Sequence, residues 1–176
     1  HPYTIASAWN PTDKHIKFVI KELGDHTKTL NANLKVGQNI TIEGPYGRFD
    51  FIDKKPRQIW IGGGIGITPF IAQMNQLALQ PDGKQIDFFH TTKEVSETAL
   101  AKLSDDVKDA NINLHLLIDN RDGYLSVEKI QAAVPDWKNA SIWFCGPSAF
   151  GEKLKAELTK AGLKTDDFHQ EVFALR

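Results

Sequence analysis

The sequence predicts an α/β protein in which a doubly wound parallel sheet over residues 56–176 follows a smaller, incomplete antiparallel β region over residues 1–55. Three observations predict this arrangement. Residues 15–21 alternate between polar and apolar side chains, as in a strand with one face in water. After residue 56, strand-like and helix-like patterns alternate along the chain instead. Two strand-like segments, 114–118 and 142–145, are too continuously apolar for a sheet with one wet face, so helices are expected on both faces.

The N-terminal part carries the short alternating segments of an antiparallel sheet or barrel. Residues 3–7 are strand-prone, 15–21 predict a half-buried strand, and 39–43 alternate again before Gly44 and Pro45 end the pattern. Residues 24–30 predict a turn that leads into a short helix. These segments are too few to close a barrel by themselves.

The second part begins after a break at residues 54–57, where we place the boundary between two domains. Strands are expected near 58–62, 86–90, 113–118 and 141–145, and helices near 68–80, 96–109, 126–132 and 147–161. Ligands of such a sheet bind at the carboxyl ends of its strands.

The segment 59–70 (IWIGGGIGITPF) predicts a strand, a glycine turn and a helix. Thr68 is expected to cap the helix, and Pro69 suits its first position. Glycines let a ligand approach the backbone closely, and the start of a helix attracts anions, so a phosphate-bearing cofactor is expected here. The dinucleotide fingerprint G-x-G-x-x-G does not fit, because its third glycine would fall on Ile67 or on Pro69. A glycine turn that serves packing alone is the alternative.

Three more polar loops follow predicted strands, namely 90–93 (HTTK), 119–123 (DNRDG) and 145–148 (CGPS). Each loop alone is compatible with simple solvation. Their common position at the carboxyl edge of a parallel sheet favours a ligand site that they share.

The composition excludes several kinds of function. A formal net charge of −1 gives no general attraction to nucleic acid, which we do not expect as a partner. The single cysteine excludes an internal disulfide and a four-cysteine metal site, and the six histidines show no metal-binding spacing. The most apolar window, 59–72, is shorter than the roughly 20 residues that a membrane span needs. The chain does not start with methionine, and we expect it to be part of a longer protein.

Five segments together resemble the landmarks of the ferredoxin–NADP reductase superfamily, in the order of that family. They are 1–7 (HPYTIAS), 24–30 (GDHTKTL), 44–49 (GPYGRF), 62–69 (GGGIGITP) and 145–147 (CGP). The resemblance implies that residues 1–55 are part of an antiparallel FAD-binding barrel. It implies that residues 56–176 are an NAD(P)-binding domain with five parallel strands in the order 3-2-1-4-5. The family's barrel strands that precede this motif would lie before His1.

Within the superfamily, the pair His1-Pro2 is similar to the ferric reductase and NADPH oxidase branch, and 168–173 (FHQEVF) resembles the tail of bacterial members. This similarity implies a FAD-dependent NAD(P)H oxidoreductase on the cytoplasmic side of a membrane, with a transmembrane haem domain on the same parent chain. Hydride would pass from NAD(P)H to the flavin, and single electrons would pass on to a haem or ferric acceptor.

The resemblance also implies roles for individual residues. Tyr3 would stack on the flavin ring, Thr4 would hydrogen-bond near its N5, and His1 and Thr27 would meet the diphosphate. Gly64, Gly66 and Thr68 would cradle the pyrophosphate of the nicotinamide nucleotide. Cys145, with Gly146 and Pro147, would lie near the nicotinamide in a positioning role. Glu171 and Phe173 would lie near the flavin, with Phe173 shielding the ring.

The choice between NADPH and NADH depends on the 2′ position of the adenosine ribose. A phosphate there needs a cation. Arg121 stands where the superfamily's NADP-dependent members resemble one another in carrying a basic residue, and Lys93 leaves the end of the neighbouring strand. Asp119 and Asp122 flank Arg121 and could hold it in a local ion pair. We therefore predict a moderate preference for NADPH.

Two other hypotheses remain open. One is a soluble reductase module that feeds an iron–sulfur or haem domain. The other is a non-catalytic nucleotide-binding module that regulates a partner.

Overall fold

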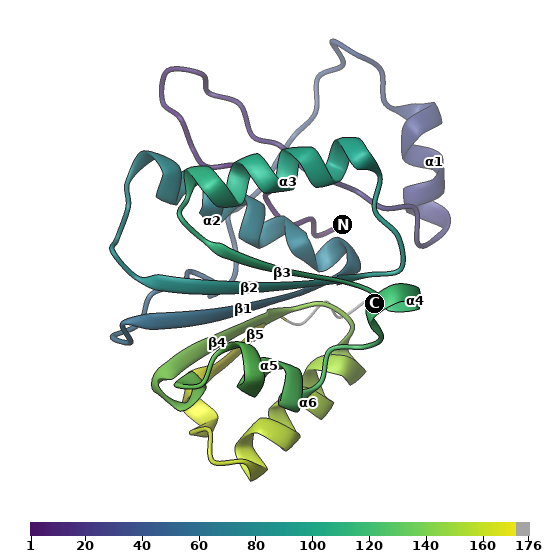
Figure 1. Ribbon diagram of the computed structural model, residues 1–176. Coiled ribbons are helices and arrows are strands. Elements are labelled where there is room, and N and C mark those ends of the chain that lie inside the picture. The colour runs from purple at the N-terminus through teal and green to yellow at the C-terminus, as the bar shows by residue number, and fades with distance from the viewer. Residues whose placement is uncertain (172–176) are drawn as a thin grey trace.

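The structure, a computed structural model, describes residues 1–171 and consists of a parallel sheet with helices on both faces (Figure 1). The five strands are β1 (Arg57–Gly63), β2 (Gln85–Thr92), β3 (Asn113–Ile118), β4 (Ala140–Cys145) and β5 (Phe168–Glu171). They are all parallel and lie in the order β3-β2-β1-β4-β5. This confirms the predicted fold class and strand order.

The long helices cover the sheet in two pairs, as doubly wound connectivity requires. Figure 1 shows α2 (Thr68–Leu79) and α3 (Glu97–Asp109) on one face, and α5 (Val127–Ala133) and α6 (Ser148–Lys160) on the other. Shorter elements are α1 (Asp25–Asn33), α4 (Asp119–Asp122), η1 (Gly64–Ile67), η2 (Trp137–Asn139) and η3 (Thr165–Asp167). Among the described residues, no helix is both long and apolar enough to span a membrane.

Alternate residues of a strand belong to two separate hydrophobic cores, because successive strand side chains point to opposite faces of the sheet. Ile59, Ile61 and Phe144 belong to the cluster on the α5–α6 face. Trp60 and Trp143 belong to the cluster on the α2–α3 face. Both faces of β1 and β4 are therefore buried, which explains their continuously apolar sequences.

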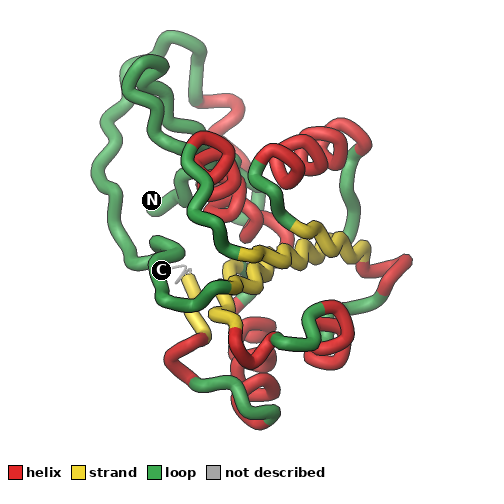
Figure 2. Tube along the Cα trace, turned by 60° about the vertical axis from the view of Figure 1, so that its left-hand side comes forward, coloured by secondary structure: helices red, strands yellow, loops and turns green. Residues whose placement is uncertain are grey.

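The antiparallel strands expected at 15–21 and 39–43 do not form, so this part of the prediction is wrong for the structure. Residues 1–56 contain one isolated antiparallel bridge, Ile5 to Phe18, and the helix α1, and the rest is loop (Figure 2). A strand is stable only when neighbouring strands bond its backbone and cover its apolar face. Residues 1–56 do not supply such neighbours, and Ile16, Val19 and Ile20 are exposed to solvent. The division of the chain at residues 54–57 remains a prediction.

Candidate functional site at the carboxyl edge of the sheet

The strand register brings the predicted loops together at one edge of the sheet. Gly62 pairs with His90 on one side and with Cys145 on the other, and Cys145 pairs with Glu171. At the outer edge, Thr92 pairs with Ile118, directly before the loop of Arg121. All four polar loops therefore leave the sheet on the side that the sequence predicted. Among the described residues, no cluster of side chains suited to a metal ion is present.

The glycine loop after β1 packs backbone to backbone against the loop after β4. A Cβ atom at Gly66 would lie 2.1 Å from the carbonyl oxygen of Cys145, and one at Gly146 would lie 3.1 Å from Cα of Gly63. Only glycine permits this approach, so the packing alternative holds for Gly66. Gly64 differs, because it has φ of +57° and a Cβ there would meet no atom of the described part of the chain within 4 Å. Gly64 thus leaves open space beside the start of α2, and a pyrophosphate contact remains a prediction for both glycines.

Thr68 does not cap α2, contrary to expectation. The residue is the first of the helix and is buried, and its hydroxyl donates a hydrogen bond to the carbonyl of Ile65 at 3.3 Å. The short η1 turn before α2 supplies that carbonyl and replaces the extended residue that a capping side chain needs. The first N–H groups of α2 have no partner inside the helix and suit an anion. Pro69 is the second residue of α2, one position after the first position that the sequence predicted.

Cys145, which is buried, and Glu171, which is half-buried, form a polar pair at this edge. The thiol Sγ lies 3.8 Å from Oε2 of Glu171 and donates to it. Burial, together with the charge of Glu171, raises the pKa of the Cys145 thiol far above its usual range. Burial also raises the pKa of Glu171, although the hydrogen bond from Cys145 opposes that shift. A thiol that keeps its proton is a poor nucleophile, which agrees with a positioning role.

The hydroxyl groups of Tyr3 and Thr4 are buried and have no hydrogen-bond partner among residues 1–171. Buried polar groups are nearly always paired, so two adjacent orphans indicate a site for a polar ligand. His1 stacks on His26 of α1 with ring centroids 3.7 Å apart, and Tyr3 lies 6.5 Å from the same ring. These residues fit a flavin, whose ring system carries several hydrogen-bonding atoms.

The Thr27 side chain caps the start of α1. Its hydroxyl accepts hydrogen bonds from the N–H groups of Leu23 and Gly24 at 2.9 and 3.0 Å, and donates to the Gly24 carbonyl at 3.0 Å. The hydroxyl is fully occupied as a cap in this arrangement. A diphosphate at this helix would therefore meet the free backbone N–H groups of its first turn.

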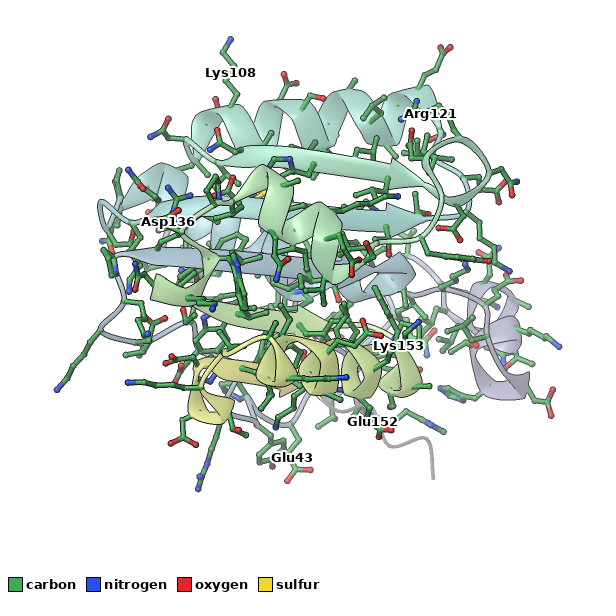
Figure 3. All side chains as sticks on the ribbon, turned by 60° about the horizontal axis from the view of Figure 1, so that its bottom comes forward. Glu43, Lys108, Arg121, Asp136, Glu152 and Lys153 are labelled. Atoms are coloured by element: carbon green, nitrogen blue, oxygen red, sulfur yellow. The ribbon has the colours of Figure 1, made fainter. Side chains whose placement is uncertain are left out.

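Arg121 forms an ion pair with Asp122, one of the two flanking acids that the sequence offered as partners. Its guanidinium donates to both carboxylate oxygens of Asp122 at 2.9 Å, which raises the pKa of Arg121 and lowers that of Asp122. Asp122 also accepts the N–H of Ile118 at 2.8 Å, so the pair is fixed to the end of β3. Figure 3 shows Arg121 at the carboxyl edge and Asp136 at the opposite end of the sheet. Lys93 is exposed in the loop after β2.

His90 is a residue that the sequence reasoning named only as part of a loop. It is buried on β2, and its Nδ1 lies 3.0 Å from the carbonyl oxygen of Gly62. Burial lowers the pKa of His90, and the bond to Gly62 opposes this only in part. A neutral imidazole that bonds the glycine loop from the next strand fixes the start of that loop. The signal that could have identified His90 from the sequence is a histidine at the end of an apolar strand. Phe173 lies outside the described residues.

Comparisons with known proteins find similarity to an FAD-binding family model, to a reductase subunit and to flavohemoproteins. Residues 1–50 match a family model described as an FAD-binding domain. The chain is 24% identical to the glycine betaine monooxygenase reductase subunit of Chromohalobacter salexigens, over 97% of this chain and 50% of that protein. It is 23% identical to a flavohemoprotein of Oceanobacillus iheyensis, over 86% of this chain and 40% of that protein. It thus spans about half the length, or less, of these relatives.

Solved structures share the fold. The FAD/NAD-binding domain of the nitric oxide dioxygenase from Vibrio cholerae superimposes with a TM-score of 0.80 and 21% identity, over 97% of this chain and 76% of that one. The ferredoxin reductase of carbazole 1,9a-dioxygenase gives 0.75 and 22%, over 98% and 52%. The described fold is therefore that of the nucleotide-binding sheet of ferredoxin–NADP reductase-like proteins, with a small N-terminal flavin-binding portion.

Proposed function

We propose, from the premise that this chain is an FAD- and NAD(P)-binding domain of the ferredoxin–NADP reductase superfamily, that it is the reductase module of a longer oxidoreductase. The module transfers electrons from NAD(P)H to a haem or iron–sulfur partner. The observation that carries the proposal is the pair of buried, unpartnered hydroxyls of Tyr3 and Thr4. A flavin satisfies both groups, whereas a nucleotide-binding module without flavin leaves them unpaired.

The residues divide into two groups by cofactor. Tyr3 and Thr4 hold the flavin ring, and His1 with the first turn of α1 holds its diphosphate. Gly64 and the first turn of α2, where Thr68 lies, hold the pyrophosphate of the nicotinamide nucleotide. When bound, FAD would accept a hydride and release single electrons. Cys145 keeps its proton and, with Gly146 and Pro147, borders the nicotinamide, while Glu171 lies beside it at the end of β5.

A soluble partner is the better supported version of this function. Several relatives are named flavohemoproteins or oxygenase reductase subunits, which supports a haem or iron–sulfur acceptor. The version with a transmembrane haem domain and a ferric acceptor rests on the pair His1-Pro2 and on residues 168–173. The regulatory module without catalysis remains the alternative from another class.

The test is purification of the full-length parent protein and anaerobic titration with NADPH and with NADH. We expect a bound flavin whose visible absorption disappears on reduction, and subsequent reduction of cytochrome c. A parent protein that contains no flavin would overturn the proposal and favour the regulatory module. A parent that contains flavin but lacks hydrophobic spans would exclude the transmembrane version.

A further inference from the structure

The segment 49–53 links the flavin-binding part to the sheet and lies on one particular face of it. Phe49 and Phe51 pack over Trp143 of β4, with ring centroids 5.2 and 5.1 Å away. Ser141, Trp143 and Cys145 alternate along β4 and so share one face. The linker therefore covers the same face of β4 that carries Cys145 at its carboxyl end.

Asp53 ends this segment in a partly buried hydrogen-bond network at the amino edge of the sheet. One carboxylate oxygen accepts from Gln58 Nε2 at 2.6 Å and from Ser141 Oγ at 2.8 Å. The other accepts from the N–H of Lys55 at 2.6 Å and from Lys84 Nζ at 3.1 Å. Asp53, Gln58, Lys84 and Ser141, which we call the Asp53 network, thus join the linker to the starts of β1, β2 and β4. Burial alone would raise the pKa of Asp53, but these hydrogen bonds outweigh it and hold that pKa below its usual value.

Among the described residues, the Lys84 ammonium donates its hydrogen bonds to Asp53 and Lys55. Besides the Asp53 carboxylate, its ammonium donates to the carbonyls of Asp53 and Lys55, each at 2.9 Å. The side chain is 17% exposed, and that of Asp53 is 11% exposed. A buried ion pair of this kind is weak evidence for stability, because desolvation offsets much of its attraction, and fixing one arrangement is its better attested use.

Phe51 adds a second sign of a fixed arrangement. Its backbone has φ of +60°, which is unfavourable for a bulky residue. The Phe51 carbonyl accepts from Gln58 Nε2 at 2.8 Å, and its ring contacts Trp60 at 5.0 Å and Phe70 at 5.7 Å. Such a conformation persists only where the surroundings over-determine it.

We propose that the Asp53 network is a positioning device that fixes the orientation of the flavin-binding part relative to the nucleotide-binding sheet. Lys84 and Asp53 are positioning residues in it and touch neither cofactor, since they lie at the opposite edge from Cys145. The proposal rests on the proposed function, because orientation matters only if two cofactors must meet. Hydride transfer depends strongly on alignment, so a loosened linker lowers its rate without lowering nucleotide affinity.

The test compares Asp53→Asn and Lys84→Met with Asp87→Asn as a matched control. Asp87 is also a buried carboxylate at the amino edge, with an ion pair to Arg57 and with His115 Nε2 at 3.0 Å. It is in register with Ile59 and so lies on the α5–α6 face, away from the linker. The first measurement is hydrogen exchange on residues 1–176, with the amide of Lys55 as the reporter. The second is the hydride-transfer rate of the flavin-loaded full-length protein in stopped flow.

We expect both network variants to exchange about tenfold faster than the parent over residues 49–55, and Asp87→Asn to match the parent there. We expect hydride transfer to slow by about tenfold with an unchanged nucleotide Kd. If the amides of residues 49–55 exchange no faster in the network variants than in the parent, the network does not restrain the linker and the proposal fails. Faster exchange with an unchanged hydride-transfer rate overturns the positioning role. Ser141→Ala, which removes a single donor, replaces any variant that does not fold and is judged by the same two results. A full-length protein without flavin would refute the proposed function, while the exchange data would still judge the restraint.

Discussion

The thiol of Cys145 lies 3.8 Å from the carboxylate of Glu171 on neighbouring parallel strands, where Cys145 is buried and Glu171 is half-buried. Burial raises the pKa of Glu171, so the folded protein binds this proton more tightly than the unfolded chain does. The associated stability is therefore fully present below the unfolded pKa and is lost as pH rises through the folded pKa.

Glu171→Gln should for this reason be more stable than the parent at about pH 8, and its advantage should narrow as pH falls to about 5. Thermal unfolding of both proteins across this range is the measurement. Glu152→Gln, on the exposed side of α6 (Figure 3), is the control and should show no such trend. An advantage of Glu171→Gln that is independent of pH would contradict the assignment.

Gly66→Ala and Gly64→Ala should differ in kind. A methyl group at Gly66 would collide with the Cys145 backbone, so we expect a loss of more than about 2 kcal/mol in free energy of unfolding. At Gly64 only the positive φ opposes a side chain, which costs about 1–2 kcal/mol. Urea unfolding measures both. Equal losses would show that the contact between the two loops is not tight.

Thr4→Val should act in opposite directions with and without flavin. In the flavin-free chain it removes an unpaired buried hydroxyl, so the free energy of unfolding should be unchanged or slightly higher. In the flavin-loaded full-length protein it would remove the proposed hydrogen bond to the flavin, and a loss of about 1 kcal/mol corresponds to about fivefold slower flavin reduction. Stopped flow and urea unfolding are the measurements. Parent-like flavin reduction would remove Thr4 from the flavin site.

Asp122→Asn should raise the preference for NADPH. The substitution frees the Arg121 guanidinium, while the amide oxygen can still accept the N–H of Ile118. We expect the ratio of kcat/KM for NADPH to that for NADH to increase by about two- to fivefold, the range for exposed charge pairs. Asp119→Asn changes the net charge equally, but among the described residues the guanidinium of Arg121 bonds to Asp122 and not to Asp119, so this variant should leave the ratio nearer the parent value.

Arg121→Ala completes the same experiment. If Arg121 carries the preference for NADPH, its removal should lower the ratio below that of the parent, with Lys93 keeping part of it. An unchanged ratio in both Asp122→Asn and Arg121→Ala would assign the ribose 2′ position to other residues.

The sequence by itself determined the sheet and the edge at which its loops meet. The periods of the apolar residues placed four strands and four helices within a few residues of their observed ends. Such periods depend only on which side chains must leave water, and this is a local property of the chain. Parallel connectivity then required the loops of Gly64, Lys93, Arg121 and Cys145 to lie at one edge.

Only the tertiary structure decided which neighbour each of these residues meets. Asp53 contacts Ser141 across 88 positions of sequence, and no local pattern of residues marks such a pair. The same limit explains Gly66, whose need for glycine comes from the backbone of a loop on another strand. It also explains residues 15–21, which have the alternation of a strand but form only one bridge, from Phe18 to Ile5, among the described residues. A local pattern reports that a side chain or a backbone edge needs a partner, and long-range packing determines whether that partner is present.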